Sequence, residues 1–328
     1  MFQSRPPGGR PPPGGGSFFE ALISREHIAK VRQGDLDAMA ELDAMGIFPG
    51  VGETAAAFAG RLETLNRNTA KMEEALRQGG KYTVEGVTVA ANSRIPAAVF
   101  AGPLAHTGRL FGFRCDWVPG FFFTARPLSF FGGYAFYFFP EFFAMFLARR
   151  EFAKKPKFLF IDRDELVAHE MCHIARASLE SHAFEELFAY QTAATGFRRF
   201  AGGVFREQSD SFLFLGATFF LLFWQMLRAF LLPQLPASVG WLVLAADLIF
   251  LVLRHLRTYR QFLRARDKLA SLYGDAAAAR AVLFHASDSE IPRLAADARP
   301  GRLLEEWSGA ELRWQVVRKR FPWPTTES

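Results

Sequence analysis

Residues 162–176 read DRDELVAHEMCHIAR and contain His169-Glu170-Met171-Cys172-His173, an H-E-x-x-H motif. Histidines four positions apart lie on one face of an α-helix, one turn apart, so both imidazoles can bind a single Zn²⁺. The Glu170 carboxylate points beside the metal, where it can accept a proton from a zinc-activated water. The chain has only 7 histidines in 328 residues, so this spacing seldom arises by chance. The motif therefore predicts a zinc site on a helix.

The flanking residues favour the helix that the motif needs. Asp162 is a good N-cap, and Glu165 three positions later gives a capping-box pattern. Neither Gly nor Pro occurs in residues 157–195. The apolar run 158–161 ends a strand or leads into the helix. We therefore expect a helix that begins just after Asp162.

A catalytic zinc site has three protein ligands and one open position, so a third ligand is expected. Residues 178–183 indicate a turn, and the following residues a second helix folded back on the first. Residues that face each other in such a helix pair are equally far from the turn, and the midpoint of His173 and Glu186 falls inside this turn. Small residues on the same helix face as Glu186 permit close approach to the histidine helix. Glu185 shares its face with the bulky Phe188. We predict Glu186 as the ligand, with Glu185 as its substitute, and expect Glu185→Gln to be mild.

The pattern His169–His173 followed by Glu186-Leu-Phe-Ala resembles the gluzincin group of zinc metallopeptidases, over about forty residues. The resemblance implies that His169, His173 and Glu186 bind zinc and that Glu170 is the general base. The spacing is shorter than in thermolysin-like enzymes, and Tyr190 stands where many members have Asp. His182 and Tyr190 are candidates for stabilising the oxyanion.

The motif is also compatible with other interpretations. The motif also fits two surface histidines with a salt-bridging glutamate, or a zinc site without turnover. Cys172 lies inside the motif, but its offset from both histidines indicates a packed thiol rather than a ligand. With Cys115 it makes two cysteines, which do not form a disulfide framework.

The composition of the chain limits its possible partners and the character of its N-terminal segments. The chain is 50% apolar, contains 37 Phe and has a net charge of +6. Its arginines cluster around apolar segments and no nucleic-acid-binding signature is present, so we expect no nucleic-acid partner. Residues 1–16, rich in Pro and Gly, predict a disordered leader without the apolar stretch of a secretory signal. Residues 17–80 show helical periodicity interrupted by turns and predict a helical N-terminal region.

Residues 81–209 are expected to form the zincin-like metal domain. Residues 82–84 and 87–89 predict a hairpin around Glu85-Gly86. Short runs at 110–113, 120–124 and 135–139 indicate further extended segments. Within them, residues 129–139 are our candidate for an edge strand that pairs with extended substrate. Residues 141–155 read as a helix.

Two apolar stretches then follow, at residues 211–232 and 237–253, with a short charge-free connection. At the helical rise they extend about 33 and 26 Å, against a hydrocarbon core of about 30 Å. They predict a transmembrane hairpin over residues 210–254; the alternative is a buried hairpin in a soluble core. Asp247 lies near mid-membrane and is expected to pair with Gln225 or Arg228, or to mark a functional contact.

Arginine placement predicts the orientation. Arginines precede the first stretch and follow the second, and the connection has none, which puts both flanks in the cytoplasm. Residues 255–328 then form a basic, helical cytoplasmic tail that contacts anionic lipid.

These observations predict an α+β protein: a zincin-like domain with a helical N-terminal region and a two-span hairpin in the inner membrane. The expected function is a membrane-anchored zinc metallopeptidase that hydrolyses peptide bonds on the cytoplasmic side, with peptide or protein substrates and membrane lipids as partners. The alternative is a non-catalytic zinc-binding membrane scaffold or regulatory module. Substrate specificity and oligomeric state do not follow from the motif.

Overall fold

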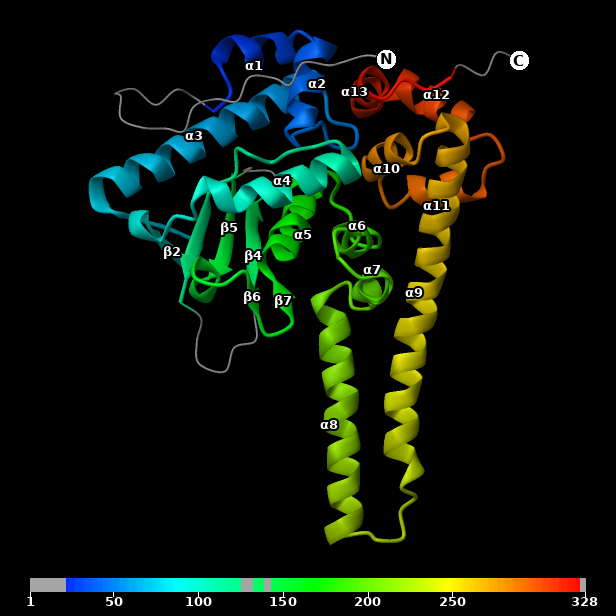
Figure 1. Cartoon of the computed structure of the whole chain (residues 1–328). Coiled ribbons are helices and arrows are strands. Elements are labelled where there is room, and N and C mark those ends of the chain that lie inside the picture. The colour runs from blue at the N-terminus through cyan, green and yellow to red at the C-terminus, as the bar shows by residue number, and fades with distance from the viewer. Residues whose placement is uncertain (1–21, 125–131, 139–142, 325–328) are drawn as a thin grey trace.

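Helices make up most of the regular secondary structure and small sheets the remainder, so this is a mostly helical α+β protein, in line with the predicted α+β class (Figure 1). The computed structural model describes residues 22–124, 132–138 and 143–324. The predicted disordered leader, residues 1–16, lies outside the described residues. The sheets and most of the helices form one body, and a long pair of helices extends from one end of it.

The N-terminal region is helical, as predicted. Its helices are α1 Arg25–Arg32, α2 Leu36–Ala44 and α3 Ala55–Gly79. Each begins at a polar residue whose side chain accepts a backbone N–H from the first turn, namely Ser24, Asp35 and Thr54. The apolar faces of these helices belong to the main hydrophobic core. Local capping sets where the helices begin, and burial holds them in place.

A small sheet lies beside the motif helix. The elements of this region are β1 Lys81–Val84, β2 Val87–Ala90, α4 Ala97–Phe111, β3 Gly120–Phe123, β4 Gly133–Phe138 and β5 Phe143–Arg149. Strands β1 and β2 form the predicted antiparallel hairpin around Glu85-Gly86. The order of the other sheet is β3-β5-β4, with β5 parallel to β3 and antiparallel to β4. β4 is thus an edge strand inside the predicted range 129–139, of which 129–131 and 139 lie outside the described residues.

Two local predictions were wrong. Residues 143–149, expected to be helical, form the central strand β5, and all seven of its residues are buried. A strand covered on both faces has a continuous apolar run, and periodicity alone does not distinguish it from a buried helix. Residues 110–113, expected to be extended, include the last turn of α4, which ends at Gly112 with φ +77°. This glycine supplies the left-handed conformation of the helix cap.

The motif helix is α5, Arg163–Arg176, and it begins where the sequence predicts. The Asp162 side chain accepts hydrogen bonds from the backbone N–H groups of Asp164 and Glu165. Two short strands, β6 Lys157–Phe158 and β7 Ile161–Asp162, pair in a tight hairpin directly before it. α5 packs against α4 and β4, so its inner face is covered by the sheet.

The chain then turns back towards α5. A 3₁₀ turn, Ala177–Leu179, is followed by Glu180 in the left-handed region, with φ 47°. The second helix of the predicted pair is α6, Glu185–Tyr190, a short helix that packs against α5. Helix α7, Gly196–Ala201, follows, and its Arg198 forms an ion pair with Glu165 of α5 at 2.9 Å.

Two long apolar helices form the projection seen in Figure 1: α8 Gln208–Phe230 and α9 Ser238–Tyr273. Both are long and apolar enough to cross a membrane. Only 6% of the most apolar window of α8 and 22% of that of α9 is buried inside the protein. The core helix of a soluble protein would be mostly buried, whereas the described residues leave most of both windows uncovered.

The C-terminal residues join the same core as the N-terminal helices. They form α10 Ala276–Phe284, α11 Glu290–Ala296, α12 Pro300–Ala310 and α13 Leu312–Arg320. α10 and α11 pack on the second half of α9, and α13 packs on α2. Trp314 is fully buried. The first and last described helices of the chain therefore pack in one body, which also carries the motif.

Asp247 does not form the expected pairs. Neither of its carboxylate oxygens has a hydrogen-bond partner among the described residues. Arg228 instead donates to the Leu235 carbonyl at 2.7 Å and to Gln225 Oε1 at 2.9 Å, near the connection between the helices. Asp247 is thus an unpartnered carboxylate in an apolar segment.

Candidate metal centre

α5 and α6 bring two histidines and one glutamate together. The Nε2 atoms of His169 and His173 lie 3.1 Å apart. The Glu186 carboxylate lies 3.6 Å from His169 Nε2 through one oxygen and 3.5 Å from His173 Nε2 through the other. One ligand atom from each residue falls within 4.8 Å of the others, so the group can hold a metal ion.

The spacing of these atoms fits zinc. Donor atoms arranged tetrahedrally about zinc at about 2.0–2.2 Å lie about 3.3–3.6 Å from one another. The two histidine nitrogens lie 3.1 Å apart, slightly closer than this range, and the two oxygens of Glu186 lie 3.5 Å from His173 and 3.6 Å from His169. Two imidazole nitrogens and one carboxylate oxygen are also a donor set that zinc prefers, and it leaves a fourth position for water or substrate. A single zinc ion therefore suits the geometry and the chemistry of the group.

Glu185 has a different position from Glu186. Its Oε1 lies 3.1 Å from His173 Nδ1, on the ring nitrogen opposite the metal group, and its Oε2 accepts from Arg176 Nε at 2.8 Å. The Arg176 side chain is fully buried and also donates to the carbonyls of Phe284 and Ala286. Glu185 thus orients the His173 imidazole, as the outer partners of metal-bound histidines commonly do.

His169 is held by α6 as well. Its imidazole bonds to the backbone of Ala189 and contacts the Tyr190 ring edge to face, with ring centroids 4.7 Å apart. Tyr190 therefore lies beside the group, as the sequence suggested. The His182 side chain is exposed, and its backbone N–H donates to Asp288 at 2.7 Å. The structure places Tyr190, but not the His182 imidazole, against the histidines.

Glu170 faces the edge strand. Its Oε2 accepts a hydrogen bond from the backbone N–H of Ala135 in β4 at 2.8 Å, which leaves Oε1 free of that bond. Burial raises the pKa of Glu170, and the His173 charge and the Ala135 bond partly offset this effect. A carboxylate with a raised pKa accepts a proton more readily, as a general base near neutral pH must.

Burial and mutual charge also shift the pKa values of the three candidate ligands. Burial raises the pKa of Glu186 to about 7, opposed by His173 and reinforced by Glu170 and Glu185. Burial lowers the pKa of His173, but the hydrogen bond and charge of Glu185 outweigh it and raise the value to about 9. Burial and then the His173 charge lower the pKa of His169 well below its ordinary value. Three carboxylates thus surround two imidazoles, an arrangement that favours a bound cation.

Two residues of this region were not predicted from the sequence. Asp288, more than a hundred positions away, accepts hydrogen bonds from Ser181 Oγ and from the backbone N–H groups of residues 182–184. It thereby fixes the loop that leads into α6. Tyr137 of β4 is the other: burial, reinforced by the charges of Glu185, Glu170 and Glu186, raises the pKa of its hydroxyl to about 12. No local sequence pattern marks either residue.

The cysteines take no part in the group. Cys172 is fully buried, and its thiol donates to the Ala168 carbonyl of the preceding turn at 3.4 Å. Cys115 is buried in the same core. Both are packed thiols, as the sequence indicated for Cys172.

No protein-family model, curated protein or solved structure matches this chain. Its function is therefore argued from the site itself.

Proposed function

We propose that this protein is a membrane-anchored zinc metallopeptidase whose active site faces the cytoplasm. The observation that carries the proposal is the convergence of His169, His173 and Glu186 at zinc-ligand spacing, with Glu170 on the same helix. In this assignment the two histidines and Glu186 bind zinc. A bound zinc ion supplies the Lewis acidity that activates water and polarises a peptide carbonyl.

The protein's own residues move the proton. Glu170 Oε1, the oxygen not bound by Ala135, accepts a proton from the attacking water and passes it to the leaving amine nitrogen. Glu185 holds the His173 imidazole in position through a hydrogen bond to Nδ1, and the Ala189 backbone holds the His169 imidazole through another hydrogen bond. Tyr190 and Tyr137 offer hydroxyl groups for the developing oxyanion. β4 offers an edge to which an extended peptide can add.

The alternative function is a zinc-binding scaffold without turnover. Glu170→Gln separates the two because it keeps the size and hydrogen bonding of the side chain but removes the proton acceptor. We expect zinc to stay bound at about one per chain while hydrolysis falls by on the order of 10²–10⁴. Zinc stoichiometry and cleavage of casein or a peptide library measure this, with His173→Ala as the variant that loses zinc. Unchanged cleavage in Glu170→Gln would contradict the peptidase mechanism.

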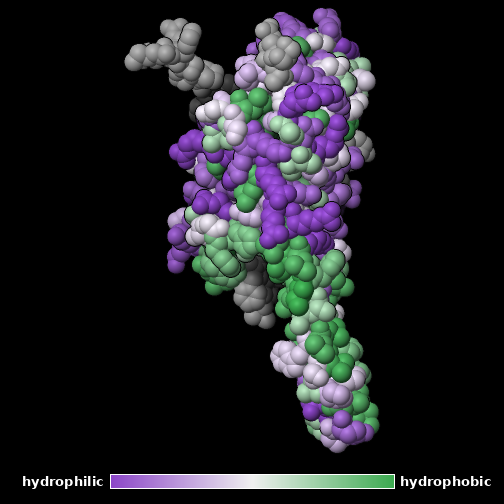
Figure 2. Space-filling view, turned by 90° about the vertical axis from the view of Figure 1, so that its right-hand side faces the viewer, coloured by the Kyte–Doolittle hydropathy of each residue, from purple (hydrophilic) through white to green (hydrophobic). Residues whose placement is uncertain are grey.

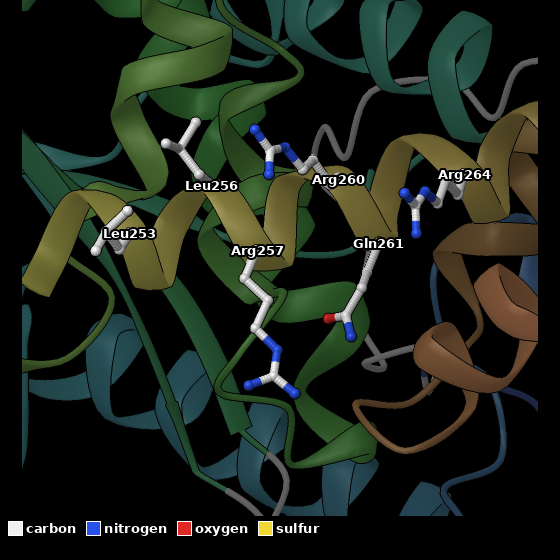
Figure 3. Close-up of a pocket in the computed structure, with 6 residues that line it drawn as sticks. All are labelled: Leu253, Leu256, Arg257, Arg260, Gln261 and Arg264. Carbon is white, nitrogen blue, oxygen red and sulfur yellow. The ribbon is translucent and has the colours of Figure 1, made fainter.

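We also propose that α8 and α9 cross the membrane as a hairpin. Little of either apolar window is buried in the protein. Directly after its apolar half, α9 bears a groove of about 360 Å³ (Figure 3). Leucines line one end of the groove, and three arginines and one glutamine line the rest: Leu253, Leu256, Arg257, Arg260, Gln261 and Arg264. Arginines in this position follow the positive-inside rule and suit the phosphates of the cytoplasmic leaflet.

A further inference from the structure

The hairpin β6–β7 has an exposed apolar tip. Strand register pairs Phe158 with Ile161, so Leu159 and Phe160 form a two-residue turn. Their side chains are 61% and 77% exposed. Tight turns of this kind normally carry Gly, Asn or Asp, which are polar or small. Two large apolar side chains at such a tip indicate a surface that contacts something apolar.

The backbone of this tip is also unusual. Leu159 has φ +52°, in the left-handed region that glycine favours. A non-glycine residue is disfavoured there because its Cβ comes close to the following carbonyl oxygen. The chain therefore keeps a leucine at a position where glycine would be more stable in the isolated domain. Such strain is typical of sites where a side chain has a role in binding.

The tip is part of a larger apolar surface, which we call the basal patch: Leu159, Phe160, Phe197 and Phe205. Phe197 of α7 is 77% exposed, and Phe205 lies just before α8. The Phe205 ring contacts Phe214 in α8, with centroids 5.7 Å apart. The β6–β7 hairpin and α7 lie at the level where α8 leaves the body (Figure 1). Figure 2 shows hydrophobic surface at this end of the body, continuous with the projection.

Cations flank the basal patch. Lys154, Lys155 and Lys157 precede the tip, are exposed, and have no ion-pair partner among the residues that the structure describes. Lysines close to an anionic leaflet are attracted to its negative surface potential. An apolar tip with basic residues behind it is the pattern of a segment that lies in the membrane interface. The bilayer around α8 and α9 is the surface that meets both requirements.

We infer that the basal patch is a second membrane contact, in which Leu159 and Phe160 insert into the cytoplasmic leaflet beside the hairpin. This inference rests on the proposed transmembrane hairpin, whose membrane the patch shares. β7 runs directly into α5, so the contact also sets the height of the metal group. His169 lies six residues beyond Arg163, about 9 Å further along the helix axis. The metal group is thereby held close to the membrane surface.

Depth-dependent quenching tests the contact in the full-length protein. Both native cysteines are buried, so an environment-sensitive fluorophore can be attached to an introduced cysteine. The test variant is Phe160→Cys. The positive control is Phe219→Cys on α8, which is 60% exposed. The matched control is Val51→Cys, also an exposed apolar residue, whose loop adjoins Ser178 at the far end of α5 from the tip. Each is reconstituted into anionic liposomes with and without nitroxide-labelled lipid.

We expect labels at positions 160 and 219 to shift emission to shorter wavelength and to lose intensity with nitroxide lipid, and the label at 51 to do neither. Quenching at 219 without quenching at 160 would overturn the second contact and leave the hairpin standing. No quenching at 160 or 219 would overturn both. Quenching at 51 to the same extent as at 160 would also refute a specific contact, because the whole body would then adsorb without preference.

Discussion

Glu185→Gln is the most informative change at the metal centre. From the sequence alone we expect this change to be mild, because Glu186 is the predicted ligand. In the structure Glu185 contacts His173 Nδ1 at 3.1 Å and Arg176 Nε at 2.8 Å. Glutamine keeps one acceptor oxygen but loses the negative charge that both neighbours face. We therefore expect a clear effect on zinc binding, smaller than the loss of a direct ligand.

The effect of Glu185→Gln on zinc affinity has two contributions of opposite sign. Loss of an outer partner of a metal-bound histidine weakens metal binding by about 10- to 100-fold, or about 1.4–2.8 kcal/mol. Against this, a zinc ligand must be neutral, and Glu185 helps to raise the pKa of His173 to about 9. At pH 7 deprotonating His173 then costs about 3 kcal/mol. Removal of the Glu185 charge lowers that pKa and reduces the competing protonation.

The difference in zinc affinity between wild type and Glu185→Gln should depend on pH. Below pH 9 the proton on His173 competes with zinc more strongly in the wild type than in Glu185→Gln, so the two proteins bind zinc with similar affinity near pH 6–7. Towards pH 9 this competition disappears, and the variant becomes weaker by the full 10- to 100-fold. Competition with a chelator of known affinity at pH 6, 7.5 and 9 measures the ratio of dissociation constants.

Glu186→Gln is the matched control for that experiment. It removes one negative charge from the adjacent position, but from a direct ligand, and should weaken zinc binding at every pH. Equal zinc affinity of wild type and Glu185→Gln at pH 9 would refute the role of Glu185 in orienting His173. Loss of zinc in Glu185→Gln with none in Glu186→Gln would instead make Glu185 the ligand.

Three further predictions concern the surrounding structure. Asp288→Ala should destabilise the α5–α6 loop by about 1–3 kcal/mol, measured by thermal unfolding, because four donors lose their acceptor. Burial raises the pKa of Asp288, but hydrogen bonds from Ser181 and the loop outweigh burial and hold this pKa below 3.8. The stability that the Asp288 carboxylate contributes is therefore complete above about pH 4 and is lost as the pH falls through its pKa in the folded protein. An Asp288→Ala protein that loses stability in acid to the same extent as the wild type would contradict this. Asp247→Leu should leave stability in detergent unchanged or raise it by up to about 3 kcal/mol, because the carboxylate has no partner; a decrease would mean that an interaction has been removed. A reporter fused at Ser238 should lie outside the cell and reporters at both termini inside, and the reverse pattern would contradict the arginine-based orientation.

Local patterns in the sequence determined the parts of this protein that depend on neighbouring residues. Four-residue spacing places two histidines on one face of any helix, and Asp162 caps that helix through its own next turn. The two apolar helices were predicted for the same reason, because length and composition are sufficient. These features follow from backbone geometry within one element and need no knowledge of the rest of the chain.

The tertiary structure decided what depends on distant contacts. The central strand β5 was mistaken for a helix because burial on both faces is set by its neighbours, not by its own residues. The contrast between Glu185 and Glu186 depends on the rotation of α6 against α5, and Asp288 fixes the loop that leads into α6. Hydrogen bonds and packing between residues a hundred positions apart leave no periodic trace in the sequence, so only the folded chain shows which carboxylate faces the histidines and which supports them.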